Sequence, residues 1–177
     1  MALLNETATY FFRIVQDVLW QDVLLHITRL TDPPRQGAFE NLTLRRLPDA
    51  VADTTLAREL RGLITDAQER SEFAREWRNR RLAHQELSLA LDGKAEPLPS
   101  ASRQKIEVVL KSFRKVMNRL HSSYLTSGVA YEHVLASDDA THLVHLLAVA
   151  TWFENRQAKR FQQGKLLPED LEGPPEV

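Results

Sequence analysis

The chain has 177 residues, of which 43% are hydrophobic and 27% are charged, and this composition is typical of a soluble globular domain. Its 23 Lys and Arg residues nearly balance its 24 Asp and Glu residues, which disfavours a strongly cationic nucleic-acid wrapper or a polybasic membrane protein but allows a local basic site. The lack of cysteine excludes disulfides, thiolate metal sites, iron–sulfur clusters and a cysteine nucleophile.

No stretch reaches the roughly 18 consecutive apolar residues that a transmembrane helix needs. The first residues also lack the basic segment and apolar core of a secretory signal. These features predict a cytoplasmic protein with no membrane partner.

Strong helix formers dominate long stretches without Gly or Pro, and no alternating strand pattern or internal repeat occurs, which predicts an all-α fold. A first helix is expected over residues 5–31, ending at Asp32-Pro33-Pro34 because proline cannot continue a helix. This helix is apolar on two sides, which predicts packing against two partners, the second being a helix or another subunit. The two sides carry Phe11, Ile14, Val15, Val18 and Leu25, and Phe12, Leu19, Trp20, Val23, Ile27 and Leu30.

The middle of the chain is expected to hold a loop over residues 32–42 and a short helix over 43–50 that Pro48 breaks. Apolar spacing predicts further helices over 54–70 and 71–89. Ser71 stands where an N-cap of the second would lie, although the two helices could also be continuous.

Two more helices are predicted, over residues 100–127 and 137–163. Four or five antiparallel helices joined by short loops make a bundle, here over residues 1–164. Residues 165–177 contain three prolines and four acids, which favours a mobile acidic tail.

The most unusual segment runs from Arg75 to His84 and contains four arginines. Arg80 and Arg81 lie four and three residues before His84, so each shares a helix face with it. Neighbouring cations disfavour the charged form of a histidine, whereas arginine forks bind phosphate and stay charged. A neutral base beside phosphate-binding arginines suits cleavage of RNA by its own 2′-hydroxyl, which needs no metal and no protein nucleophile. Alternatively, the arginines form a solvated face and the histidine is structural.

Three other groups of polar residues are considered for a function. Asp22, His26 and Arg29 share one face of the first helix, where they either orient the arginine segment and contact RNA or form a surface ion pair. The helix over 100–127 has six basic residues and one Glu, and this face either contacts RNA phosphates, is covered by the acidic tail, or only keeps the protein soluble. His142 and His145 lack the spacing of a known zinc signature, and no metal or cofactor is predicted.

Arg78-Asn79 followed by four residues and His84 matches the R-polar-x4-H motif of the HEPN superfamily. The first helix, from Leu19-Trp20-Gln21-Asp22 to Asp32-Pro33, and the segment Asn41-Leu42-Thr43-Leu44 extend the resemblance. Together they resemble the AbiU-type abortive-infection branch of HEPN proteins over most of residues 5–160.

This resemblance implies an all-α bundle of four to five antiparallel helices that pairs as a homodimer, with the motif residues of both subunits lining a shared cleft. Many such proteins are metal-independent endoribonucleases of phage-defence or toxin–antitoxin systems. His84 would then be the general acid/base, Arg78 would hold the scissile phosphate, and Asn79 would position the RNA.

Two further arginines inside the motif, Arg80 and Arg81, leave open which arginine contacts phosphate, and both are candidate substrate-binding residues together with Asp22, His26 and Arg29. The expected partners are a second copy of the chain, an RNA substrate and an antitoxin protein. The competing hypotheses are a non-catalytic HEPN module that binds a nucleotide, RNA or an antitoxin, and a purely structural dimerisation bundle.

Overall fold

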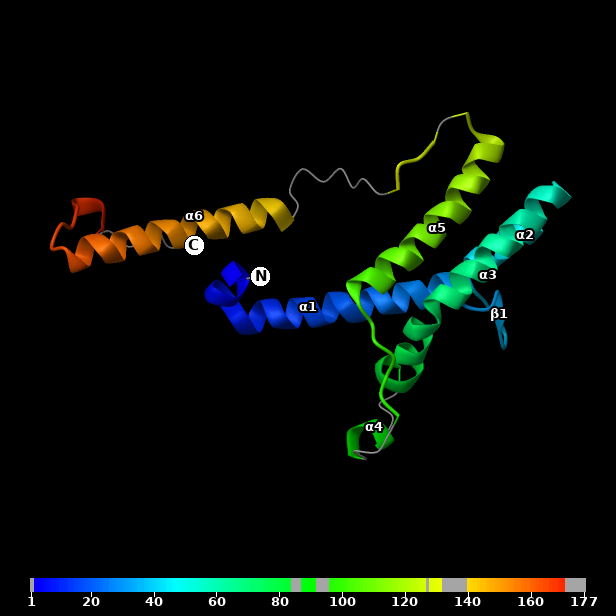
Figure 1. Cartoon of the computed structure of the whole chain (residues 1–177), viewed down its shortest axis with the longest axis horizontal. Helices are drawn as coiled ribbons and strands as arrows, with labels where there is room; N and C mark the ends of the chain where they lie inside the picture. The colour runs from blue at the N-terminus through cyan, green and yellow to red at the C-terminus, as the bar shows by residue number, and fades with distance from the viewer. Residues whose placement is uncertain (1, 84–86, 92–95, 127, 132–139, 171–177) are drawn as a thin grey trace. The chain divides into compact units, whose positions relative to one another are not determined.

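The computed structural model describes residues 2–83, 87–91, 96–126, 128–131 and 140–170 (Figure 1). The chain divides into two compact units, one formed by residues 17–133 and the other by residues 1–16 with 134–177. Helices make up most of the described chain, which confirms the predicted all-α class. The extent of the domain, predicted as residues 1–164, stays a prediction.

The first helix, α1 (Ala2–Thr31), covers the predicted range with one non-helical residue at Ala8. The expected loop after it contains a small antiparallel hairpin of β1 (Arg35–Gln36) and β2 (Phe39–Glu40). Gly37 turns the chain between them with a φ of 60°, a left-handed conformation that glycine adopts without strain. Strands of two residues are too short to produce an alternating pattern, which is why the sequence did not indicate them.

The short helix predicted over 43–50 forms as a 3-10 turn, η1 (Leu44–Arg46), followed by α2 (Leu47–Ala50). The Thr43 side chain caps η1 by accepting the Arg45 amide hydrogen. The expectation that Pro48 breaks this helix was wrong. Pro48 lies in the first turn of α2, where its missing N–H would have no helical partner.

The two helices predicted over 54–70 and 71–89 form one helix, α3 (Thr54–Trp77), which continues into the π-helical turn η2 (Arg78–Leu82). Asp53 caps α3 by accepting the amide hydrogens of Thr55 and Leu56. The alternative of a continuous helix is thus confirmed, and Ser71 is not an N-cap, because it lies within α3 and is 1% exposed. Its hydroxyl donates to the Gln68 carbonyl instead of capping a helix.

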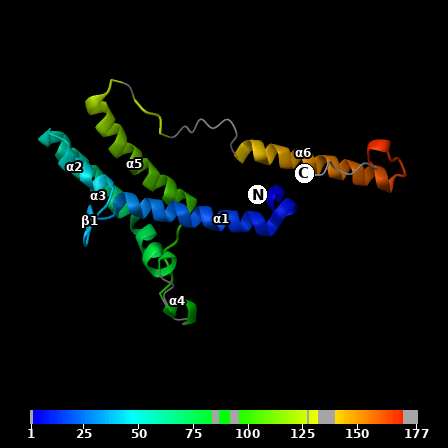
Figure 2. The same ribbon diagram turned by 180° about the vertical axis from the view of Figure 1, so that it is seen from behind.

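The core of the unit formed by residues 17–133 lies between α3, α5 (Arg103–Tyr124) and the last turns of α1, and Ser102 is the N-cap of α5. The two helices run side by side in both views (Figures 1 and 2). They are antiparallel, since Arg119 of α5 contacts Glu59 while Lys105 lies over Phe73. Each fully buried aliphatic or aromatic side chain contributes roughly 1.5–3 kcal/mol. The largest contributions come from Leu24, Ile27, Leu56, Leu60, Ile64, Val109, Phe113 and Val116.

The remaining described helices are α4 (Leu87–Leu91) and α6 (Ala140–Gln162). A 3-10 turn, η3 (Pro168–Asp170), follows α6 inside the predicted tail. Arg160 pairs with the Asp170 carboxylate and Gln157 donates to the Asp170 carbonyl at 2.8 Å, so the start of this tail is attached to α6. Residues 171–177 lie outside the described residues. No described helix is long and apolar enough to cross a membrane.

Candidate functional site

A buried polar junction joins the end of α1 to the middle of α3. Thr31 and Ser71 are each 1% exposed, and their hydroxyl oxygens lie 3.3 Å apart. Both hydroxyls also donate to carbonyls of their own helices, Thr31 to Ile27 and Ser71 to Gln68. Because each hydroxyl has only one proton, the hydrogen bond that crosses from α3 to α1 here is donated by Arg75 Nη2 to Thr31 Oγ1 at 3.3 Å, and it fixes the end of α1 against α3.

Asp32, the residue after α1, lies beside this junction and holds the motif arginine. The Nη1 atom of Arg78 is 2.7 Å from each carboxylate oxygen of Asp32. The Asp32 side chain is only 12% exposed and that of Arg78 24%, so solvent screens the pair less than a surface ion pair. Nη2 of Arg78 has no hydrogen-bond partner among the described residues.

Arg75 binds the same carboxylate from one turn earlier on α3. Its Nη1 atom is 3.2 Å from Asp32 Oδ1, and its Nη2 atom is 3.3 Å from the carbonyl oxygen of Thr31. The last carbonyls of a helix lack helical partners, so a guanidinium at the end of α1 satisfies one of them and interacts well with the helix dipole. Two guanidinium groups therefore share one buried carboxylate.

The backbone changes geometry at Arg78. The amide of Ala83 donates to the Arg78 carbonyl at 2.8 Å, which is the hydrogen bond of a π-helix rather than an α-helix. Such turns are rare and often occur at functional sites. The wider turn changes the directions of the side chains within η2 relative to an α-helix, and the predicted pairing of Arg80 and Arg81 with His84 stays a prediction because His84 lies outside the described residues.

The other arginines of the motif contact different parts of the same unit. Arg80 donates from Nη2 to the Glu96 carbonyl at 2.8 Å. The Arg81 guanidinium lies 5.4 Å from the ring centre of Trp77, a cation–π contact, and Trp77 in turn donates its indole N–H to the Pro99 carbonyl at 2.8 Å. Arg80 thus contacts the segment before α5 and Arg81 contacts the last residue of α3, whereas Arg78 contacts Asp32 at the end of α1.

Asn79 supports Arg78 directly. Its side-chain oxygen accepts a hydrogen bond from Arg78 Nε at 3.1 Å, which orients the guanidinium plane. His84, the predicted general acid/base, lies outside the described residues. The structure therefore places Arg78 and Asn79 together and does not locate the histidine.

The second predicted cluster lies on the exposed surface of α1. His26 Nδ1 is 3.3 Å from Asp22 Oδ1, and their side chains are 58% and 60% exposed. Arg29 is exposed as well. Asp22 and His26 form the predicted i,i+4 pair, but the carboxylate that holds Arg78 is Asp32 rather than Asp22.

Asp32 and Arg75 are the site residues that the sequence analysis missed. Asp32 was interpreted only as part of the helix stop, and Arg75 only as one cation of a run. The available signal was the position of an acid directly after α1 in a chain whose third helix carries an arginine cluster. Within the described residues, no three His, Asp or Glu side chains are grouped so that they could hold a metal ion.

The described residues are helical apart from one small hairpin, and Arg78 and Asn79 of the motif lie together where α3 passes into η2. The AbiU2 family model of HEPN domains matches residues 2–143, and the chain belongs to this family. The predicted resemblance to AbiU-type HEPN proteins is thereby confirmed. No curated protein and no solved structure matches the chain.

Proposed function

We propose that this AbiU2-family protein is a metal-independent endoribonuclease of the HEPN type that acts in phage defence or in a toxin–antitoxin system. The observation that carries the proposal is the fixed position of Arg78. Asp32 and Asn79 orient its guanidinium at the start of a π-helical turn, and Nη2 has no partner among the described residues. His84 completes the motif later in the same segment.

The proposed reaction uses the 2′-hydroxyl of the RNA as nucleophile. His84 accepts the 2′-hydroxyl proton, the 2′-oxygen forms a bond to phosphorus, and the bond to the 5′-oxygen breaks. The leaving 5′-oxygen takes up a proton, and the products are a 2′,3′-cyclic phosphate and a 5′-hydroxyl. In a homodimer with a shared cleft, two copies of His84 are available for the two proton transfers.

Arg78 would stabilise the extra negative charge on the phosphoryl oxygens in the transition state. Arginine is suited to this role because it remains protonated and presents several donors in a fixed plane. Prior orientation by Asp32 and Asn79 means that little reorganisation is needed during the reaction. Asn79 would also contact the RNA, with Arg80 and Arg81 as further substrate-binding residues.

The exposed cluster on α1, formed by Asp22, His26 and Arg29, remains a proposed RNA contact. Its high exposure leaves it accessible to a ligand, and Arg29 supplies the cation. The Asp22–His26 pair would orient the imidazole ring rather than take part in the reaction.

The homodimer belongs to the same proposal. Leu24 and Ile27 of α1 are buried in the core, whereas Ile14 and Val18 on the same helix are 63% and 57% exposed. A second copy of the chain would cover these apolar side chains and supply the other half of the cleft. Light scattering at micromolar concentration should then give twice the mass of the chain, and a monomeric mass would contradict the shared cleft.

One observation favours the alternative of a non-catalytic HEPN module. The charge of Arg78 is already balanced by Asp32, as expected if the arginine only joins α1 to α3. Such a module would bind a nucleotide, RNA or an antitoxin without cleaving RNA. The cleavage assay distinguishes the two functions, because a binding module forms no product and in such a module Arg78→Ala would change only thermal stability.

The test is RNA cleavage in excess EDTA by the wild type, by His84→Ala and by a control, His145→Ala, which removes a histidine from α6. We expect cleavage by the wild type and the control and a loss of about 100-fold or more in His84→Ala. Absence of cleavage by a folded, dimeric wild type on several RNAs would favour the binding module. Equal cleavage by wild type and His84→Ala would contradict the proposed site.

A further inference from the structure

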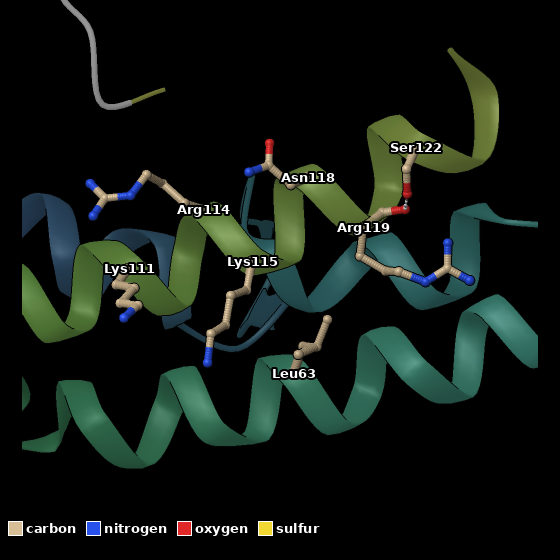
Figure 3. Close-up of a pocket in the computed structure, with 7 residues that line it drawn as sticks. All are labelled: Leu63, Lys111, Arg114, Lys115, Asn118, Arg119 and Ser122. Atoms are coloured by element: carbon tan, nitrogen blue, oxygen red, sulfur yellow. Dashed lines mark hydrogen bonds between the residues drawn. The ribbon is translucent and has the colours of Figure 1, made fainter. Parts of the chain in front are cut away.

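A second basic feature lies along the contact of α3 and α5, away from the motif. It is an open groove of about 630 Å³ (Figure 3). In that view Lys111 and Lys115 extend from α5 toward α3, with Leu63 opposite them, and Arg114 and Asn118 project from the other edge of α5. The residues that line the groove are Leu63, Lys111, Arg114, Lys115, Asn118, Arg119 and Ser122.

Three of the basic residues of this groove carry charges that no ion pair among the described residues balances: Lys111, Arg114 and Lys115. The other basic side chains along α5 are engaged. Arg119 is paired with Glu59 at 2.5 Å, Arg103 lies 3.9 Å from Glu107, and Lys105 lies over the Phe73 ring. Of the six basic residues predicted to form one face of this helix, only these three therefore lack an ion pair or ring contact among the described residues.

The carboxylates of α3 near this stretch do not neutralise it. Asp66 interacts electrostatically with Lys115, but its carboxylate is held by Arg70 at 2.8 Å, and this hydrogen bond keeps the pKa of Asp66 below its usual value. Glu59, the other acid beside the groove, is held by Arg119. Each carboxylate therefore has an arginine of its own, and the three cations give the groove an excess positive charge.

The polar residues of the groove follow one another along α5 at the spacing of helical turns. Lys111 and Lys115 are four residues apart and project toward α3, whereas Arg114 and Asn118, also four residues apart, project from the other edge of α5, so the groove has two short rows with a step of about 6 Å. Asn118 and Ser122 also line a neighbouring hollow with Leu125, Thr126 and Gly128, which continues the groove past the end of α5. An amide beside cations is a typical contact of phosphate and sugar oxygens, whereas the Ser122 hydroxyl already donates its proton to the Arg119 carbonyl at 3.0 Å.

We propose that this groove binds the sugar–phosphate backbone of RNA, at a site separate from Arg78, without reading its sequence. No aromatic side chain lines the groove, so bases have no surface on which to stack. Leu63 is its single large apolar residue, whereas protein partners are usually anchored by buried aromatic or aliphatic clusters. Repeated charge beside a single large apolar side chain fits a polyanion with regularly spaced phosphates better than an acidic protein.

The groove and the motif lie at different positions along α3. Leu63 precedes Arg78 by 15 residues, which corresponds to about 22 Å of helix. A strand held in the groove would thus extend the contact surface well beyond the scissile phosphate. The inference rests on the proposed function, because that function makes RNA the ligand.

The experiment measures binding of a fluorescent 20-nucleotide single-stranded RNA by anisotropy at 50 and 200 mM salt. All proteins carry His84→Ala so that the RNA stays intact. The test variant adds Lys111→Gln, Arg114→Gln and Lys115→Gln. The matched control adds Arg103→Gln, Lys159→Gln and Lys165→Gln, which removes the same charge elsewhere. Circular dichroism of both variants verifies that α5 still folds.

We expect the groove variant to bind RNA at least about tenfold more weakly at 50 mM salt, with the slope of log affinity against log salt reduced by about 2. The RNA affinity of the control variant should stay within about threefold of its parent.

Equal losses in both variants would mean that net charge alone governs binding, and no loss in the groove variant would mean that RNA binds elsewhere. Either result overturns the proposal. An acidic peptide that binds the groove when RNA does not would also overturn it. Selective loss of binding in a protein whose wild type cleaves no RNA would support the groove and reject the ribonuclease.

Discussion

The two cationic regions of the unit formed by residues 17–133 are built in opposite ways. Arg75 and Arg78 are half-buried and share the carboxylate of Asp32, with contacts of 3.2 and 2.7 Å. Lys111 and Lys115 are exposed, and no described carboxylate pairs with them. The guanidinium of a paired arginine is held in one orientation, but the carboxylate offsets much of its positive charge. The ammonium group of an unpaired lysine keeps its full effect on a ligand, but nothing holds it in one orientation.

This difference suits the two regions to the different tasks proposed for them. One phosphate that must be held in a defined geometry requires an oriented guanidinium, which the Asp32 pair provides. A backbone of many equivalent phosphates requires charge and tolerates movement, which the α5 groove provides. The predictions below test this contrast.

The largest effect is expected from Arg78→Ala, compared with Arg81→Ala. Loss of an oriented donor to the transition state should reduce cleavage about 100- to 1,000-fold. Arg81 contacts the Trp77 ring, so its loss should reduce cleavage by less than about tenfold. Single-turnover rates measure both. A larger loss in Arg81→Ala would show that Arg81, and not Arg78, holds the phosphate.

An intermediate effect is expected from Asp32→Asn, with Asp22→Asn as the matched control. The amide keeps the size of the carboxylate but leaves two guanidinium groups without their shared counter-charge, which should cost roughly 2 kcal/mol of folding stability. For a chain of this length the melting temperature should fall by about 4–8 °C. Asp22 is 60% exposed, and its substitution should change the melting temperature by less than about 2 °C.

The cleavage rate of Asp32→Asn sharpens the same comparison. If Asp32 positions Arg78, the rate constant should fall about tenfold at temperatures where the variant is folded, while RNA affinity, set by the groove, stays within about threefold. A variant that melts earlier and cleaves at the wild-type rate would assign Asp32 a structural role only.

The smallest effect is expected when acid protonates Asp170. This residue forms an ion pair with Arg160 outside both cationic regions. The hydrogen bond from Arg160, with a second from the Leu167 amide, holds the pKa of Asp170 below its ordinary value of 3.8. A lowered pKa means that the charged form stabilises the folded contact, so the contact is complete at neutral pH and is lost as the pH falls through the lowered value.

The NMR resonance of the Leu167 amide reports this titration, since it donates to Asp170 at 2.9 Å. We expect a midpoint below pH 3.8 and no change at neutral pH. A midpoint at or above the ordinary value would contradict the attachment of residues 165–170 to α6.

The helical fold could be predicted from sequence because its signals are local. The apolar residues of α5 recur at helical spacing, and Ser102 precedes it as a cap. The failures occur where distant residues decide the structure. Ser71 has the chemistry of a cap, but its burial against Thr31, 40 residues earlier, keeps it inside α3.

The candidate site was predictable only in part, for the same reason. Arg78 and Asn79 were found as a motif. The carboxylate that orients Arg78 lies 46 residues earlier in the chain, where it was interpreted as a helix stop. The π-helical turn also gives no signal in a periodicity based on α-helical spacing. Periodicity reports which face of a helix is apolar, but it does not report which polar residues meet across two helices.

The central claim is that Arg78 and His84 act on the 2′-hydroxyl reaction of RNA. Its most direct test is mass spectrometry of the products formed by the wild type in excess EDTA, with one RNA and a copy that has 2′-deoxyribose at the cleavage position. We expect a 2′,3′-cyclic phosphate and a 5′-hydroxyl from the RNA and no cleavage at the deoxy position. Products with a 5′-phosphate, or cleavage of the deoxy substrate at the same site, would contradict it.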